Sequence, residues 1–349
     1  MAADGGCTAM RQVWIEKTGP PEVLRLREVP DPAPESGELR IRVAFAGVNF
    51  AEVMARLGLY PDAPSLPFVP GYEVAGTVDA VGSGVDAYQV GERVTAVTQF
   101  GGYADCVCLP PALVVRTPDS TSDEEAAALP VNYLTAHQML HRVCAVRPGE
   151  VVLVHGAAGG VGTAATQLCG IVGARVIGTA SAAKHERLRD VGVEPVASDD
   201  PDLTSRVREL TDGRGVDIVL DPIGGRSFRT SYELLAPGGR LCCFGVSAMA
   251  PGRRKNLLAA LASLARMPRF GPIALMNENR SVAGVNLGHL WDETEMLVPQ
   301  FEAIMKHAAA GRIRPIIDSV HDLDRASDAH ERLQSRQSVG KILLAARDD

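Results

Sequence analysis

The segment "VVLVHGAAGGVGTAATQL" (151–168) constrains the fold of this chain more than any other. An apolar run of strand type leads into four glycines within seven residues, and a helical pattern follows. Glycines at such a turn let the backbone approach a ligand, and the helix N-terminus aims free N–H groups at an anion. The G-x-G-x-x-G spacing for a dinucleotide pyrophosphate falls on Ala157, Gly159 and Gly162. The turn therefore predicts a dinucleotide site; the alternative is a tight connection without a ligand.

The patterns on either side of this turn divide the chain into two parts. From Gln12 to about Val115, alternating apolar residues with frequent Pro and Gly predict an antiparallel, barrel-like β domain. From about Leu134, apolar strands alternate with helical stretches, which is typical of βαβ units around a parallel sheet. A helical pattern follows Asn286, and we expect the last strand, "GKILLAA", to return to the first domain. Residues 1–9 show no periodicity and are expected to form a tail.

Residues after the second strand of the βαβ run bear on the choice of nicotinamide cofactor. An NAD site usually carries Asp or Glu there, where the carboxylate holds the ribose 2′-OH. Residues 178–183 contain no acid, and Ser181, Lys184 and Arg187 lie in this region instead. A hydroxyl and a cation suit a 2′-phosphate, so these residues favour NADPH (NADP). The alternative is that Lys184 is a solvated residue at a helix start.

A series of motifs resembles the medium-chain dehydrogenase/reductase superfamily, specifically its zinc-free quinone oxidoreductase branch. In order along the chain they are "GVNFAEVMARLGLY" (47–60), "PGYEVAGTVDAVGSGV" (70–85), "GERV" (91–94), "AAALPVNYLTAH" (126–137) and "HGAAGGVG" (155–162). Within that branch, "GTASAAKHE", "DPIGG", "GRRKNLLAALASL", "LGHL" and "RPIIDSV" resemble the vesicle amine transport protein homologues. The resemblance covers most of the chain from residue 12 onward.

The resemblance implies an α/β fold of two domains. A Rossmann doubly wound parallel sheet would span 135–288, and a GroES-like β-barrel catalytic domain would combine 1–134 with 289–349. It also implies NADPH in the cleft between the domains and homodimers that join two Rossmann sheets edge to edge.

Two positions where zinc-dependent members of the superfamily carry metal ligands differ in this chain. Those members supply a Cys and then the His of a G-H-E motif, whereas this chain has Asn49 and Tyr72. Neither side chain is a usual zinc ligand, so we expect no metal. Without a Lewis acid, the reaction that the resemblance implies is hydride transfer to a quinone or to the β-carbon of an α,β-unsaturated carbonyl. There the negative charge spreads over a conjugated system that hydrogen-bond donors can stabilise.

The resemblance also implies which residues bind the cofactor. Asn49 is expected near the nicotinamide ribose and the substrate, and Thr135 at the nicotinamide end. The other matches are the pyrophosphate turn Gly159, Gly160, Val161 and Gly162; Ser181 and Lys184 at the 2′-phosphate; Gly245, Val246, Val285 and Asn286 along the nicotinamide half; and Lys341, before the last strand, closing over the cofactor.

Two residues are expected to act in catalysis, Asn49 and Tyr60. The Tyr60 phenol is the best candidate to hydrogen-bond a carbonyl or to deliver a proton; the alternative is a ring that only packs in its loop. Met54 stands where some quinone oxidoreductases place a tyrosine, and Asp199 stands where a second tyrosine is common. These departures leave open the proton donor and the strictness of the NADPH preference.

The segment 249–280 is unusual between two Rossmann strands. Four leucines recur at helical spacing between flanking cations: Leu257, Leu258, Leu261 and Leu264, with Arg253, Arg254, Lys255, Arg266 and Arg269. We favour a surface helix whose apolar stripe packs on the core. The alternatives are a lid over an apolar substrate pocket and a basic helix that contacts anionic lipid through 253–269.

Composition narrows the class of partner and compartment. The formal net charge of −7 argues against a nucleic-acid-binding face, which is usually basic. Seven scattered cysteines, with no signal-peptide or membrane-span pattern, indicate reduced thiols and a cytoplasmic protein. The sequence thus predicts an NADPH-dependent quinone or enone reductase; the alternative is a cofactor-binding, lipid- or membrane-associated protein with little catalysis.

Overall fold

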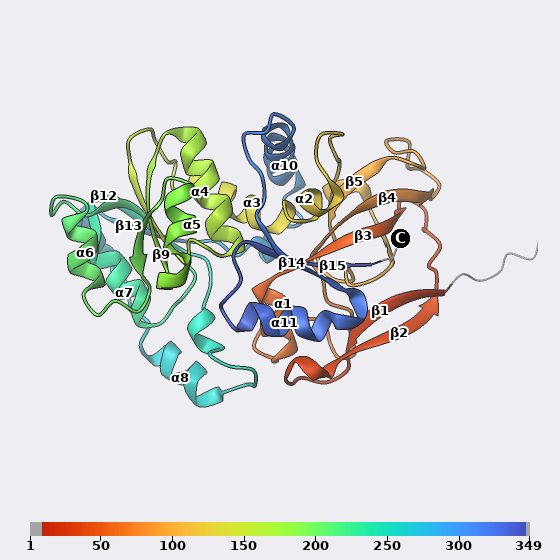
Figure 1. Cartoon of the computed structure of the whole chain (residues 1–349), viewed down its shortest axis with the longest axis horizontal. Helices are drawn as coiled ribbons and strands as arrows, with labels where there is room; N and C mark the ends of the chain where they lie inside the picture. The colour runs from red at the N-terminus through yellow and green to blue at the C-terminus, as the bar shows by residue number, and fades with distance from the viewer. Residues whose placement is uncertain (1–8, 347–349) are drawn as a thin grey trace, which may run out of the picture. The chain divides into compact units, whose positions relative to one another are not determined.

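The computed structural model describes residues 9–346, which divide into two compact units (Figure 1). One unit runs to Val131 and resumes at Leu290, and the other is Asn132–His289. Residues 1–8 and 347–349, and with them Cys7, lie outside the described residues. The tail expected at residues 1–9 is one residue too long, because Ala9 already pairs with Pro30 in an antiparallel ladder.

A six-stranded parallel sheet forms the centre of the second unit. Its strands are β8 (Val151–His155), β9 (Arg175–Ala180), β10 (Glu194–Ala197), β11 (Val216–Asp221), β12 (Leu235–Cys243) and β13 (Ser281–Gly284). They lie in the order β10-β9-β8-β11-β12-β13, and every pair is parallel. Counted from β8 this is the order 3-2-1-4-5-6 of a doubly wound sheet, in which ligands bind where the order reverses. That point lies between β8 and β11.

The apolar runs of the sequence account for these strands, and their prediction is confirmed. Every residue of β11, for example, is buried, as expected for a strand covered on both faces. Helices follow the strands: α4 (Gly160–Val172), α5 (His185–Asp190), α6 (Leu203–Glu209), α7 (Arg226–Glu233), α8 (Leu257–Ala265) and α9 (Pro272–Glu278). α3 (Pro130–His137) precedes β8 and continues into one π-helical segment, Gln138–Val143.

The first unit is mainly antiparallel β structure, which confirms the predicted strands. β1 (Ala9–Ile15) pairs with β2 (Leu24–Pro30). A seven-stranded sheet contains β3 (Leu39–Val48), β4 (Glu73–Val81), β5 (Arg93–Val97), β6 (Cys106–Leu109), β7 (Val114–Arg116), β14 (Ile317–Asp322) and β15 (Lys341–Ala345). Its helices are α1 (Phe50–Arg56), α2 (Asp123–Ala127), α10 (Thr294–Ala309) and α11 (Ala326–Gln334).

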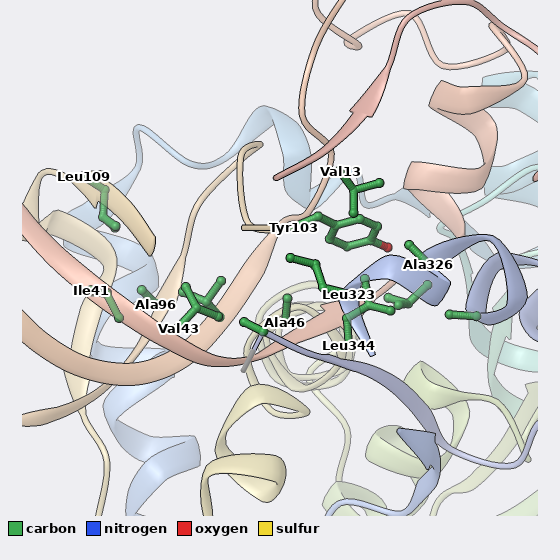
Figure 2. Packing of buried hydrophobic residues seen from close by; sticks show 14 of the residues in the cluster. Val13, Ile41, Val43, Ala46, Ala96, Tyr103, Leu109, Leu323, Ala326 and Leu344 are labelled. Atoms are coloured by element: carbon green, nitrogen blue, oxygen red, sulfur yellow. The ribbon is translucent and has the colours of Figure 1, made fainter. Parts of the chain in front are cut away.

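The end of the chain returns to the first unit, as the sequence predicts. β15 pairs antiparallel with β3, and Leu344 lies opposite Ala46 (Figure 1). Figure 2 shows the core that this pairing completes, with Tyr103 between strand residues and the C-terminal residues Leu323 and Leu344. The core of this unit is therefore built from both ends of the chain, and the last strand is part of it.

Two local features were not predicted. The sequence predicted mostly strands and turns before Val115 and did not identify α1, which begins one residue after Asn49. The leucine stripe of α8 was expected on the core, and this is wrong: Leu258 is 81% exposed and Leu261 61% exposed within this chain. The small residues Ala260 and Ser263 pack inward instead, so the helix lies close to the unit with its bulky face outward. Among residues 9–346, no helix is long and apolar enough to cross a membrane.

Candidate cofactor and substrate residues

The glycine turn lies at the carboxyl end of β8, where α4 begins. Gly156 has a φ of +69° and turns the chain, and Gly159 is the N-cap of α4. A Cβ atom on Gly162 would lie 2.3 Å from the Gly156 carbonyl oxygen, so only glycine lets the first turn of α4 pack against the loop. Gly160 and Val161 are the first two residues of that helical turn. The turn thus offers the N-terminus of a 13-residue helix, a setting that suits a pyrophosphate.

Ala157 takes the first position of the fingerprint without blocking the turn. Its side chain is buried, and a Cβ atom on Gly178 of β9 would approach the Ala157 Cβ to 2.6 Å. The glycine in the neighbouring strand therefore makes room for the alanine. Sequence reasoning missed that Gly156, one residue earlier, adopts the left-handed conformation that the tight turn needs.

Ser181 and Lys184 follow β9, on the side of the sheet order that includes β10. Ser181 is exposed, Lys184 is half-buried, and the Lys184 N–H donates to the Ser181 carbonyl oxygen over 2.9 Å. The exposed Asp199 follows β10, one residue after Ser198, whose N–H donates to the Ala180 carbonyl oxygen. Both the cation and the acid therefore lie beyond the carboxyl ends of adjacent strands.

The residues expected along the nicotinamide half lie beyond the strands on the other side of the reversal. Gly245 and Val246 follow β12, and a Cβ atom on Gly245 would lie 2.9 Å from the Pro222 carbonyl oxygen in the loop after β11. Val285 follows β13, and its N–H donates to the Cys243 carbonyl oxygen over 2.9 Å, while the next residue, Asn286, is exposed. Thr135 is buried on α3. The segments that follow β11, β12 and β13 thus pack against one another in that order.

In the first unit, Asn49 belongs to a buried polar cluster with Glu52, Glu73 and Lys341. The Asn49 amide nitrogen donates to Glu73 Oε1 over 2.8 Å and to Glu52 Oε1 over 3.2 Å. Lys341, the first residue of β15, donates from Nζ to Asn49 Oδ1 over 2.6 Å and forms an ion pair with Glu73. Because an ammonium group only donates, the amide orientation is fixed with its oxygen toward Lys341. Both amide hydrogens are already donated to carboxylates, so Asn49 can only accept a hydrogen bond from a ligand.

The two carboxylates of this cluster have different surroundings. Burial raises the pKa of Glu52 from its ordinary 4.5 to about 8, although hydrogen bonds from Asn49 favour the charged form. Glu73 instead faces the Lys341 ammonium and also accepts the Val131 N–H over 2.7 Å. Sequence reasoning missed both residues. The Asn-x-x-Glu spacing at 49–52, a capping-box pattern, was the available signal for Glu52.

Tyr60 and Tyr72 lie together in an aromatic cluster of the first unit. Their ring centroids are 6.4 Å apart in an edge-to-face arrangement, and Tyr72 also contacts Phe100 and Trp291. Tyr72 is buried, whereas Tyr60 is only half-buried. Burial raises the pKa of Tyr60 above its ordinary value, so the phenol keeps its proton at neutral pH and can act as a donor. Met54 is buried on α1.

Comparison with known proteins identifies families that share these features. A family model described as "Zinc-binding dehydrogenase" matches residues 160–303, and one described as "Alcohol dehydrogenase GroES-like domain" matches residues 35–119. The synaptic vesicle membrane protein VAT-1 homolog of Danio rerio is 42% identical over 90% of this chain, which spans 65% of that protein. Its Homo sapiens counterpart is 39% identical over 92% of this chain and 82% of its own length.

Solved structures agree with these matches. A mycobacterial protein, Rv1454c, in complex with NADPH is 33% identical, with a TM-score of 0.84 over 96% of this chain and 99% of that one. The CurK enoyl reductase is 27% identical, with a TM-score of 0.82 over the same shares of the two chains. The first unit therefore contains a GroES-like domain, and the second has the Rossmann-like parallel sheet that was predicted.

The residues of this chain do not fit the zinc ion that one family description names. Asn49 and Tyr72 are poor zinc ligands, and the Lys341 ammonium already occupies the Asn49 oxygen. A second cation beside that ammonium would be repelled. In the part of the chain that the structure describes, no group of three or more His, Cys, Asp and Glu side chains could hold a metal ion.

The close packing of the glycine turn predicts opposite effects for two substitutions in one helix. We expect Gly162→Ala to lower the free energy of unfolding by about 1–3 kcal/mol, because the methyl group would collide with the Gly156 carbonyl. Gly170→Ala, at an open position of the same helix, should raise it by about 0.5–1 kcal/mol. Denaturant unfolding monitored by circular dichroism measures both. Equal effects at the two positions would contradict the packing described here.

The burial of Glu52 predicts a dependence of stability on pH. Since the folded chain holds a proton on Glu52 that the unfolded chain releases, stability should fall as pH rises from about 4.5 to about 8. Glu52→Gln removes this titration and should flatten the slope in that window. Glu73→Gln is the contrasting variant: it should lower stability, because it leaves Lys341 buried without its carboxylate, and it should keep a slope because Glu52 can still titrate. Thermal unfolding at a series of pH values distinguishes them, and an unchanged slope in the Glu52 variant would refute the assignment.

Proposed function

Because the chain belongs to the medium-chain dehydrogenase/reductase superfamily and is close to VAT-1 homologues and quinone oxidoreductases, we propose that this oxidoreductase is an NADPH-dependent reductase of quinones or of α,β-unsaturated carbonyls that works without zinc. The observation that carries the proposal is the Lys341 ammonium bound to Asn49 Oδ1. An ammonium group in this place argues against a metal ion that would polarise an alcohol or a simple ketone. Acceptors whose own conjugation spreads the charge are then the suitable substrates.

The second unit supplies the residues that would hold the cofactor. Gly159, Gly160, Val161 and Gly162 form the helix N-terminus for the pyrophosphate, and Ser181 with Lys184 would hold the 2′-phosphate. The complex of a related mycobacterial protein with NADPH supports this choice. The carboxylate of Asp199, after the neighbouring strand β10, would repel the 2′-phosphate. We therefore propose a preference for NADPH over NADH rather than an absolute requirement.

Bound NADPH would supply the hydride. Asn49, held by Lys341 and two carboxylates, would accept a hydrogen bond from a hydroxyl of the nicotinamide ribose, since its amide hydrogens are already used. The Tyr60 phenol would donate to the acceptor oxygen as negative charge develops there. A phenolate and an enolate both place that charge on oxygen, so one donor serves either substrate class. The likeness to an enoyl reductase keeps enoyl thioesters among the candidates.

We also propose that the chain forms a homodimer and that it is located in the cytoplasm. The short strand β13 ends the sheet order of the second unit and leaves one edge open to a second copy. Edge-to-edge pairing of two such sheets would satisfy its free backbone groups.

A second candidate function is a cofactor-binding protein that associates with lipid and catalyses little. The exposed leucines of α8 favour it, because they stand between Arg253, Arg254 and Lys255 on one side and Arg266 and Arg269 on the other. If this function holds, glutamine at these five cations should abolish sedimentation with vesicles of anionic lipid and leave NADPH binding intact. Sedimentation that survives the replacements would count against it.

The reductase is tested by following NADPH consumption with an ortho-quinone and, in parallel, with an enone. We expect turnover with NADPH, and Lys184→Ala should lower kcat/KM for NADPH about tenfold or more while leaving the NADH rate nearly unchanged. Gly159→Asp should abolish both, because its carboxylate would stand where the pyrophosphate binds. Arg189→Ala, an exposed cation on α5, is the matched control. Tight NADPH binding without turnover on any acceptor would reject the reductase in favour of the second candidate.

A further inference from the structure

A polar hollow lies in the second unit between the loop after β11 and the helix α8. It measures about 360 Å³, and its walls include Gly224, Gly225, Arg226 and Ser227 on one side and Ser263 and Arg266 on the other. The residues assigned to the cofactor and the substrate do not line it. A cavity of this size can hold a small ligand.

Ser263 carries a buried hydroxyl that the described residues leave unsatisfied. The residue is only 6% exposed, and its Oγ has no hydrogen-bond partner in residues 9–346. A serine inside a helix ordinarily bonds back to the carbonyl four residues earlier, so this orientation toward the hollow needs a reason. A buried hydroxyl without a partner destabilises the folded chain, and a ligand with an acceptor oxygen would offset that cost.

The opposite wall presents the N-terminus of α7. Gly225, the N-cap, has φ +59° and follows Gly224 at φ +81°, so both need the freedom of glycine. A Cβ atom on Gly225 would come within 3.0 Å of Ser263 Oγ, so the glycine leaves room beside the buried hydroxyl. The partial positive charge of the helix end therefore faces the same space as the unsatisfied hydroxyl.

Two arginines give this space a positive charge. Arg226 and Arg266 are both exposed, and neither forms an ion pair within the described part of the chain. The described lining includes no Asp or Glu. The buried carboxylate of Asp221, at the end of β11, accepts hydrogen bonds from Ser227, Ser231 and the Ile223 N–H. The hollow thus combines two cations, a helix N-terminus and a hydroxyl donor.

The topology separates the hollow from the glycine turn. The chain passes from β8 through α4 to β9 in one direction along the sheet, and from β11 through α7 to β12 in the other. Since both crossovers are right-handed, α4 and α7 lie on opposite faces of the sheet. The N-terminus of α7 is therefore not the one that would face the pyrophosphate.

We propose that this hollow binds a phosphate-type oxyanion, held by Arg226, Arg266, the Ser263 hydroxyl and the N-terminus of α7. The donors suit a phosphate monoester, because guanidinium groups and a helix end both favour its charge and its several acceptor oxygens. A soluble phosphate ester and a phospholipid headgroup share this chemistry.

Calorimetric titration of the full chain with inorganic phosphate, at constant ionic strength, tests the site. The titration is run with and without saturating NADPH. We expect binding in both cases, weakened about tenfold or more in Arg226→Gln, Arg266→Gln and Ser263→Ala. Arg229→Gln, an exposed arginine on α7 outside the hollow, should bind like the wild type. Displacement of phosphate by NADPH would overturn the proposal, since the anion would then occupy the cofactor site. A chain that binds phosphate but no NADPH would contradict the function proposed above and would still support the anion site.

Stability gives a second readout that separates binding from folding. In phosphate-free buffer Ser263→Ala should leave Tm unchanged or raise it, because the methyl group removes an unsatisfied buried hydroxyl. The same variant should lose the rise in Tm that phosphate gives the wild type. A variant that unfolds more easily without phosphate would show a purely structural role and refute the site.

Two further arms distinguish the sources of the anion. Glycerol phosphate tests the soluble ester, and vesicles of phosphatidic acid in phosphatidylcholine test the headgroup. Arginine-dependent binding of either supports the site and identifies its source. Failure of inorganic phosphate, glycerol phosphate and vesicles alike would refute it.

Discussion

The ion pair between Lys341 and Glu73 is the contact on which the first unit depends. It joins the first residue of β15 to the first residue of β4, two strands that flank β3 on its opposite sides. Both side chains are almost completely buried, and an isolated charge at either place would cost several kcal/mol. The last strand must therefore be in place before Glu73 is compensated. The same ammonium group also orients Asn49. The pairing of the last strand therefore places the residue that stabilises the fold and also orients the amide proposed to contact the ribose.

The second unit has a buried hydrogen-bonded cluster of its own at the ends of its strands. Ser231 donates to Asp221 over 2.7 Å, so the single hydroxyl hydrogen is used and His155 Nε2 must donate to Ser231 Oγ. His155 Nδ1 is then the acceptor for Thr179 Oγ1. Burial lowers the pKa of His155, which keeps the ring neutral and this direction fixed. The chain of hydrogen bonds ties β8, β9 and β11 to α7 beside the point where the sheet order reverses, and so braces the loops that follow those strands.

Features that depend on a short stretch of sequence could be predicted, whereas contacts between distant residues could not. The glycine turn, the parallel sheet of βαβ units and the return of "GKILLAA" to the first unit were all predicted from short patterns. The partnership of Lys341 with Glu73 could not be, because 268 positions separate them and no local pattern links them. Periodicity identified the leucine face of α8 but not its direction. That direction was set by Ala260 and Ser263, whose small side chains allow close packing.

The doubly wound order explains why one sheet could serve two anions. A reversal of strand order places two helices on opposite faces, each with its N-terminus at the carboxyl edge. The two ends then differ in their side chains. At α4 the glycines expose backbone N–H groups and exclude side chains, which suits a ligand that must lie close along the loop. At α7, Arg226 follows the two glycines, and Arg266, just after α8, lines the same hollow. A ligand there would be held by charged side chains rather than by close contact with the backbone. The first arrangement selects an extended dinucleotide by shape, whereas the second selects a compact, highly charged group by electrostatic attraction.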